Sequence, residues 1–191
     1  VVGATGRITG FGSVIAGSIG NAGTIAASGG TLVLTGAVAN TGLLDLGGGS
    51  LTDSGQVINN NGGVISIGTA FTLTAGTGFS NSSGGWINAA GALIAATGSI
   101  ANAGTFTVAD NLLAGGSFIN TGTVFVSGGN LIGSGGLTND AGGTISIGAG
   151  RTLSVGGVLV NGVPTGTYAY IYLNGGVLSA SSITDRGSAV I

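Results

Sequence analysis

The chain has 191 residues, of which 44 are glycine, and its three arginines and five aspartates give a net charge of −2. It contains no cysteine, histidine or methionine, so thiolate and imidazole chemistry and metal sites with Cys or His ligands are excluded. Three scattered arginines form no basic surface, and no apolar run approaches the roughly 18 residues of a membrane span. We therefore expect no cofactor, no nucleic-acid partner and no transmembrane segment.

An asparagine recurs along the chain at spacings of 18 to 22 residues. A short glycine turn follows nearly every one, as in NAGTI at 21–25 or, in a longer form, NNNGGVI at 59–65. Asn and Gly suit a bend that needs positive φ, and stacked asparagines can also form hydrogen bonds along the stacking axis. The alternative is that each asparagine favours only its own bend. The predicted asparagine ladder comprises Asn21, Asn40, Asn59, Asn81, Asn102, Asn120, Asn139 and Asn161.

Apolar residues keep fixed positions relative to these asparagines. One lies two residues before each asparagine, and another follows the glycine turn. Segments such as TISIG at 144–148 alternate apolar and small polar residues, which is the period of a half-buried strand. Each repeat therefore predicts three short strands separated by three bends. A leucine stands in the middle of seven repeats, at Leu32, Leu51, Leu73, Leu93, Leu112, Leu131 and Leu153.

These features predict an all-β fold, a three-sided parallel β-solenoid of about eight coils with about 20 residues per coil. We expect a right-handed coil, because parallel crossover connections are almost always right-handed. Residues 1–161 are predicted to form the repeats. Residues 162–191 hold the only proline and all three tyrosines, and we expect them to form a non-repeat C-terminal cap or a segment that joins subunits.

Several stretches resemble the repeats of filamentous-haemagglutinin-type and autotransporter passenger proteins. They are ITGFGSV at 8–14, NAGTIAASGGTLVLTGAV at 21–38 and NDAGGTISIGAGRTLSV at 139–155. Residues 160–191 look like the closing segment of large bacterial surface proteins with such repeats, so the resemblance covers nearly the whole chain. It implies a secreted β-helix at the surface of a bacterial cell or outside it, and it transfers no catalytic residue.

The two ends of the chain are the candidate subunit junctions. In TYAYIYL at 167–173 the tyrosines alternate with apolar residues, which gives the strand an aromatic face suited to an interface. At the other end the repeat begins almost at once, with no polar cap. An uncapped coil is a template for a further coil, either from a second copy or from a longer chain of which this one is a fragment. The predicted junction residues are Val1, Val2, Ile8, Phe11, Tyr168, Tyr170 and Tyr172.

Some apolar residues fall on the outward side of the predicted strands. Ile94, Leu113 and Ile132 each follow a mid-repeat leucine and are expected to form an exposed strip along the rod. Phe125 and Trp86 are also expected to point outward. Because soluble monomers rarely expose such a strip, it favours lateral packing between rods or cover by a loop.

The aspartates form no candidate catalytic pair. A paired-carboxylate mechanism needs two acids within about 5–10 Å of each other, and no two of Asp45, Asp53, Asp110 and Asp140 share a position in their repeats. A buried, unpaired aspartate is costly, so we expect Asp53 at a bend or bonded to backbone amides. Serine and threonine have no histidine or lysine to activate them. We therefore expect no enzyme activity.

The sequence favours a structural protein, a secreted β-solenoid subunit that stacks head-to-tail with copies of itself into an extracellular filament for matrix, attachment or sheath. The first alternative is a stalk or adhesin fragment of an autotransporter or of a surface protein secreted by a two-partner system. The remote alternative is a polysaccharide-active β-helix enzyme, which a bound sugar beside clustered acids would support.

Overall fold

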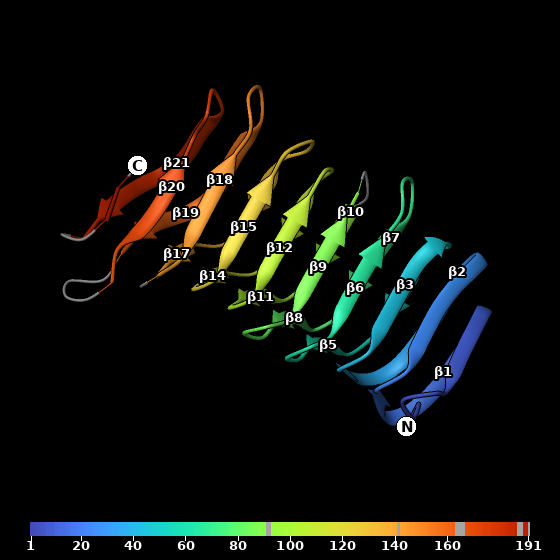
Figure 1. The fold of residues 1–191 in the computed structure, drawn as a ribbon. Helices are drawn as coiled ribbons and strands as arrows, with labels where there is room; N and C mark the ends of the chain where they lie inside the picture. Colours follow the sequence, from blue (N-terminus) through green and yellow to red (C-terminus); the bar gives the residue numbers. More distant parts are fainter. Residues whose placement is uncertain (91–92, 141, 163–166, 187–188, 191) are drawn as a thin grey trace.

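The structure, a computed structural model, is an all-β rod in which parallel strands stack coil upon coil (Figure 1). It describes residues 1–90, 93–140, 142–162, 167–186 and 189–190, and for residues 93–95 and 189–190 it describes the backbone alone. The described residues form 22 strands and no helix. Equivalent asparagines of successive coils are 18 to 22 positions apart, and the strands of successive coils pair in parallel, so the prediction of a β-solenoid is confirmed.

Three stacks of parallel strands run along the rod, and each ordinary coil contributes one strand to each stack. The first stack contains β3 (Leu43–Gly48), β6 (Val64–Ile67), β9 (Trp86–Ala89), β12 (Thr105–Val108), β15 (Thr123–Val126), β18 (Thr144–Ile147), β20 (Ala169–Tyr172) and β22 (Ala189–Val190). The second stack contains β4 (Leu51–Asp53), β7 (Thr72–Ala75), β10 (Leu93–Ala96), β13 (Leu112–Ala114) and β16 (Leu131–Gly133). The third stack contains β5 (Gln56–Asn59), β8 (Gly78–Asn81), β11 (Ser99–Asn102), β14 (Phe118–Asn120) and β17 (Leu137–Asn139).

Longer strands bend around the corners near both ends of the rod. Two of them pass through all three stacks, β1 (Arg7–Asn21) and β2 (Thr24–Asn40). Two others pass through the second and third stacks, β19 (Thr152–Asn161) and β21 (Val177–Asp185).

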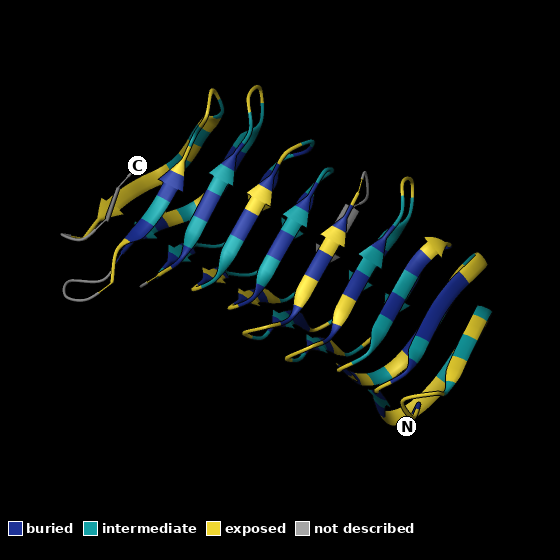
Figure 2. Ribbon diagram, viewed as in Figure 1, coloured by how far each residue is buried: buried dark blue, intermediate teal, exposed yellow. Residues whose placement is uncertain are grey.

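Inward-facing residues at equivalent positions lie directly above one another. Leu51 pairs with Leu73, and farther along the rod Leu112, Leu131 and Leu153 are consecutive partners. These side chains are buried, whereas their neighbours in the strands are half-buried or exposed, so burial alternates along each strand (Figure 2). Burial of one leucine contributes about 1.5–3 kcal/mol. Columns of apolar residues therefore hold the coils in register.

Glycine stands where the corners of adjacent coils approach most closely. A β-carbon on Gly98 would lie 1.9 Å from the carbonyl oxygen of Thr77, and one on Gly122 would lie 2.2 Å from the carbonyl oxygen of Gly104. No side chain fits at such a distance. Stacked corners are therefore one physical reason for the high glycine content of the chain.

The register of β10 differs from the sequence prediction. Ile94 pairs with Leu73 and Leu112 of the inward column, whereas Leu93 pairs with Thr72. The prediction placed Leu93 in this column because leucine fills it in other coils. The number of corner residues before the second stack varies from coil to coil, so residue type alone did not fix the position. By backbone register, Ile94 therefore takes a position in the inward column and not in the predicted outward strip. Its side chain lies outside the described residues.

The described strands within residues 162–191, a range that we expected to form a non-repeat cap or junction segment, continue the stacking. β20 pairs with β18, β21 pairs with β19, and β22 pairs with β20, all in parallel. Leu178 is the partner of Leu153, and Asp185 is the partner of Asn161. The repeat is concealed in the sequence because aspartate replaces asparagine at position 185 and because Ile171 lies 26 residues after its partner Ile145, a longer spacing than in the asparagine column. Pro164 lies outside the described residues.

Candidate functional site

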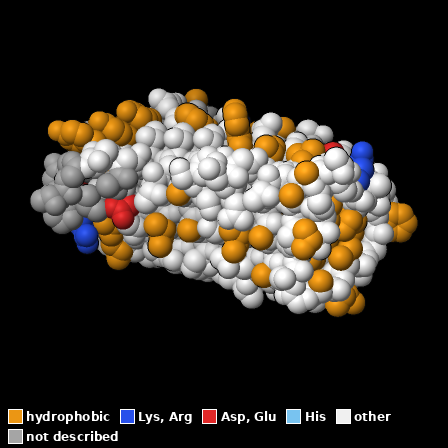
Figure 3. Space-filling model, turned by 60° about the horizontal axis from the view of Figure 1, so that its bottom comes forward, with side chains coloured by type: hydrophobic (Ala, Val, Ile, Leu, Met, Phe, Trp, Pro, Cys, Tyr) orange, Lys and Arg blue, Asp and Glu red, His pale blue; other side chains and the backbone are white. Residues whose placement is uncertain are grey.

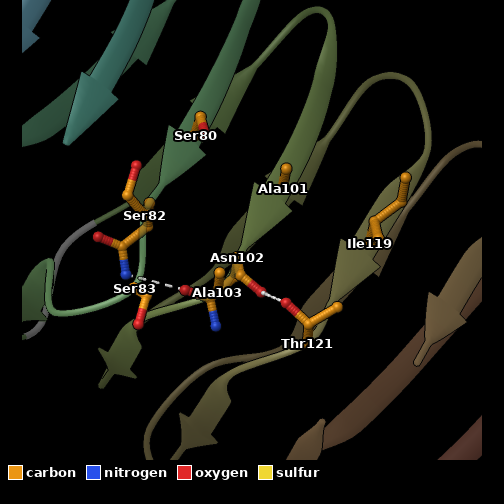
Figure 4. A pocket seen from close by; sticks show the side chains of 9 residues that line it. Ser80, Ser82, Ser83, Ala101, Asn102, Ala103, Ile119 and Thr121 are labelled. Atoms are coloured by element: carbon orange, nitrogen blue, oxygen red, sulfur yellow. Dashed lines mark hydrogen bonds between the residues drawn. The ribbon is translucent and has the colours of Figure 1, made fainter. Parts of the chain in front are cut away.

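The described residues hold no arrangement typical of a metal centre. None of them form a group of three or more Asp, Glu, His or Cys side chains able to hold an ion, and no helix among them is long and apolar enough to cross a membrane. A shallow depression lies over β8, β11 and β14, where the small residues Ser80 and Ala101 adjoin Ile119 (Figure 4). Hydroxyl, amide and methyl groups line it, with no acid or base. Asn81 and Asn102, at the edge of this depression, belong to a regular column of hydrogen-bonded asparagines.

Eight asparagines form one continuous hydrogen-bonded ladder along the corner between the third and first stacks. In each case the side-chain Nδ2 donates to the Oδ1 of the next asparagine, at 2.7–2.9 Å. All eight side chains are at most 2% exposed. The ladder runs through Asn21, Asn40, Asn59, Asn81, Asn102, Asn120, Asn139 and Asn161.

The six amides from Asn40 to Asn139 also stabilise the corners in which they lie. Asn102 Nδ2 donates to the carbonyl oxygen of Gly104 in its own turn at 3.2 Å and to that of Thr123 in the next coil at 3.1 Å. The asparagine thus forms the ladder and supports its bend at the same time. Only a side chain that accepts from one neighbouring coil and donates to the other can do both.

The ladder has a direction, so its two ends differ chemically. At the N-terminal end, Asn21 Oδ1 is buried and has no hydrogen-bond partner among the described residues. At the C-terminal end the column reaches Asp185, whose Oδ1 accepts from Asn161 Nδ2 at 3.3 Å. An ionised carboxylate has no hydrogen to donate onward. Both ends of the column therefore present an acceptor, Asn21 Oδ1 at the N-terminal end and the Asp185 carboxylate at the C-terminal end.

The N-terminal end exposes one edge of β1. This strand pairs with β2 on its other edge, and on the open edge only Val2 forms a bridge, with Asn21. The Val2 N–H donates to the carbonyl of Gly20 at 2.7 Å, and the Val2 carbonyl accepts from the N–H of Ala22 at 2.8 Å. Val2 therefore occupies the position next to Asn21 in the asparagine column, but its apolar side chain has no amide that could donate to Asn21 Oδ1.

The other residues predicted at this junction lie around the same open edge. Val1 is fully exposed and Phe11 is 72% exposed, whereas Ile8 is half-buried and packs against the core. Hydrophobic side chains gather at both ends of the rod (Figure 3). The N-terminal end thus combines unpaired backbone groups with exposed apolar side chains, as an incomplete coil does.

The C-terminal end exposes the outer edge of β21, which pairs with β19 and with no other described strand. The tyrosines lie elsewhere. Ala169 and Ile171 are fully buried, so Tyr168, Tyr170 and Tyr172 project from the side of the rod, where the last two rings stack at 5.7 Å. Strand alternation directs these rings perpendicular to the axis. This placement corrects the expectation that they form the axial junction.

The two ends of the rod repeat the same register positions. Val2 stands in the asparagine column at one end, and Asp185 stands in it at the other. Likewise, Arg7 begins a column of the first stack in which Val190 is the last described residue. Two copies stacked in register would have room for only one of these two corner segments.

The outward apolar strip is shorter than we expected. Leu113 and Ile132 are neighbours on the outside of the second stack, where Leu113 is half-buried and Ile132 is 36% exposed. The next residue in this column is Ser154. Phe125 is 44% exposed but lies on the first stack, on a different side of the rod. These side chains form no extended patch for lateral packing.

Asp53 points into the core, in the column between Leu34 and Ala75. It is 1% exposed, and neither carboxylate oxygen has a hydrogen-bond partner among the described residues. Burial raises the pKa of this carboxyl above its ordinary value, and the backbone amides of Gly55 and Ser54 offset the effect only in part. The expectation of a bend or bonded amides holds in part, because Asp53 is the last residue of β4, directly before the bend at residues 54–55, and the backbone amides of that bend favour its charged form. Side chains alternate between inward and outward along β4, and this alternation turns the Asp53 side chain inward.

Replacing Asp53 by asparagine is expected to raise the free energy of unfolding at neutral pH by about 1–3 kcal/mol, because an unpaired charge in the core is costly. The pKa of Asp53 is higher in the folded chain than in the unfolded chain. The contribution of protonated Asp53 to the free energy of unfolding is therefore fully present below the pKa that Asp53 has in the unfolded chain. It is lost as the pH rises through the higher pKa that Asp53 has in the folded chain.

Denaturant unfolding from acid to neutral pH measures this effect. The loss of stability with rising pH should be smaller in Asp53→Asn than in the native chain and should persist in the control Asp45→Asn, whose side chain is not fully buried. The same slope in Asp53→Asn as in the native chain would contradict the prediction.

Comparison of the chain with models of protein families, with curated proteins and with solved structures found no match.

Proposed function

We propose that this chain is a structural protein, a β-solenoid subunit that stacks head-to-tail into a filament. The proposal rests on one observation above all. The open edge of β1 spans all three stacks, and the open edge of β21 spans the second and third of them, so the column positions of one end continue those of the other in these two stacks. A second copy is therefore a natural partner for each edge, because it can pair the free backbone groups and extend the apolar columns.

The open end of the asparagine column bears on the same proposal. Asn21 Oδ1 is buried without a hydrogen-bond partner among the described residues, and such an atom costs about 1–3 kcal/mol. A coil added in register at this end would bring a side chain into the same column, and Asn21 Oδ1 would accept from that side chain if it carried a donor. The ionised Asp185 of a second copy carries none, so this position weakens stacking of the native chain, and the free backbone edges and apolar columns are what favour it. Non-closing head-to-tail contacts of this kind generate filaments rather than closed oligomers.

The setting that we propose is extracellular, at the surface of a bacterial cell. The support is the resemblance of the repeats to those of filamentous-haemagglutinin-type and autotransporter passenger proteins. A long, nearly uncharged rod with hydroxyl and amide groups on its sides suits a matrix, an attachment fibre or a sheath.

Electron microscopy and sedimentation velocity over a range of concentrations test this function. The purified chain is expected to form rods that lengthen with concentration, with an axial repeat of about 43 Å from nine coils of about 4.8 Å. The nine coils correspond to the column positions from Asn21 to Asp185. Single rods of one length at every concentration would contradict the proposal.

A stalk or adhesin within a longer surface protein is the second candidate. The same open edges favour it, because further coils of one polypeptide would pair with them equally well. In that case the purified chain would stay monomeric, and only a version extended by further coils would gain stability.

A further inference from the structure

The strands of the first stack lie side by side along the rod (Figure 1), and their outer side carries two columns of side chains. They lie on alternate residues of the same strands, so both columns face away from the core. One column runs Leu43, Val64, Trp86, Thr105, Thr123, Thr144 and Tyr170. The other runs Asp45, Ser66, Asn88, Thr107, Phe125, Ser146 and Tyr172. We call this surface the aromatic face.

Three exposed aromatic side chains stand at regular intervals on the aromatic face. Trp86 is 59% exposed, and Phe125 and Tyr172 are each 44% exposed. From one to the next is a step of two coils, or about 9.6 Å along the axis. Tyr170 stacks beside Tyr172 at 5.7 Å. Trp86 lies in the first column and Phe125 and Tyr172 lie in the second, so the rings form a staggered series along the rod.

Polar groups without charge fill the intervals between the aromatic rings. A trough of about 380 Å³ beside Trp86 is lined by Val64, Ser66, Asn88 and Thr107, and this volume is large enough for a small ligand. Beyond it follow the hydroxyls of threonines in the next coils. Neither column contains an Asp, Glu, Lys or Arg between Asp45 and the tyrosines. The face offers ring surfaces, hydroxyls and an amide.

This chemistry discriminates among classes of partner. A nucleic acid also stacks on aromatic rings, but its phosphates need cationic side chains, and the two columns provide none there. A stable protein interface has a buried core of clustered apolar and aromatic residues, and here hydroxyl groups separate the rings, so no such core is present on this face. A neutral sugar chain needs platforms for the C–H faces of its rings and uncharged hydrogen-bonding groups for its hydroxyls. The face has both.

We propose that the aromatic face binds an extended, uncharged polysaccharide laid parallel to the rod axis. Sugar rings stack on Trp86, Phe125 and Tyr172, and Asn88 and the threonine hydroxyls form hydrogen bonds to the sugar hydroxyls between them. The site is independent of the end coils, so one rod and a filament of stacked rods bind by the same contacts.

Trp86 is the only tryptophan in the chain, so its fluorescence reports on this face directly. Titration of the full chain with cellohexaose and with chitohexaose is expected to shift the emission to shorter wavelengths with at least one of them. The chain should also be retained on the corresponding insoluble polymer, cellulose or chitin. Phe125→Ala should weaken binding about ten-fold, since one aromatic platform is lost, and Asn88→Ala should weaken it by a smaller factor.

Ile119→Ala provides the matched control, because Ile119 is 44% exposed on β14 of the third stack. This variant should bind as the native chain does. The proposal is overturned if neither hexasaccharide changes the emission and neither polymer retains the chain. It is equally overturned if Trp86→Ala and Phe125→Ala are retained on the polymer as well as Ile119→Ala, or if single-stranded DNA binds at this face as tightly as the sugars.

Discussion

Replacing Asn102 by alanine is expected to lower the free energy of unfolding by about 3–6 kcal/mol, because it leaves several buried groups unpaired at about 1–3 kcal/mol each. In the native chain Asn102 accepts from Asn81 Nδ2 and donates to Asn120 Oδ1, both at 2.8 Å. It also donates to the carbonyl oxygens of Gly104 and Thr123. Urea denaturation followed by circular dichroism measures the loss.

Two further variants separate the ladder from simple loss of a side chain. Asn102→Asp keeps the shape and can still accept from Asn81, but its ionised carboxylate faces Asn120 Oδ1 as a second acceptor. It should therefore destabilise the chain although hardly any atoms are removed. Asn88→Ala, at an exposed position of the coil before, should change stability by less than about 0.5 kcal/mol. If Asn102→Ala behaved like Asn88→Ala, neither the ladder bonds nor the bend contacts of Asn102 would contribute to stability, and the prediction would be wrong.

The fold could be predicted from the sequence because one repeating unit decides it. A coil has the same three strands every time, so Asn, Gly and the apolar positions recur at the spacing that stacking requires. Leu51 and Leu73 occupy the same column for this reason. The asparagine ladder was predictable on the same ground, since a buried polar column must satisfy itself along the axis.

Positions that depend on corner length were not predictable with the same accuracy. Ile94, and not Leu93, takes the inward register because corners differ in length between coils. Asp53 lies in the core although its polarity argues for a bend, because strand alternation continues regardless of residue type. The coil after residue 162 escaped detection because Asp185 replaces the asparagine on which the repeat was defined. In each of these cases the pairing of the backbone with the neighbouring coil decides which column a residue occupies, whatever position its side chain would favour.

Replacing Asp185 by asparagine is expected to lower the concentration at which rods stack by about ten-fold or more. In the proposed filament, Asp185 of one copy adjoins Asn21 of the next, so that two acceptors face each other. The amide introduced at position 185 would donate to Asn21 Oδ1, as each asparagine of the ladder does to its neighbour at 2.7–2.9 Å. A buried hydrogen bond in place of an unpaired acceptor contributes about 1–3 kcal/mol, and about 1.4 kcal/mol corresponds to a ten-fold change in association. Sedimentation velocity and electron microscopy measure the shift.

The corner segment at the N-terminus adds a second barrier to the same contact. Val2 already occupies the column beside Asn21, so removal of residues 1–6 from Asp185→Asn should promote stacking further. Asp45→Asn is the matched control, because it removes the same charge from the side of the rod, where Asp45 accepts from the Gly47 N–H. If Asp45→Asn promoted stacking equally, net charge and not the ladder would limit assembly. If the native chain stacked and neither form of Asp185→Asn stacked better, the junction would not pass through the asparagine column. An aspartate at the last ladder position is therefore expected to act as a stop that limits how readily rods join.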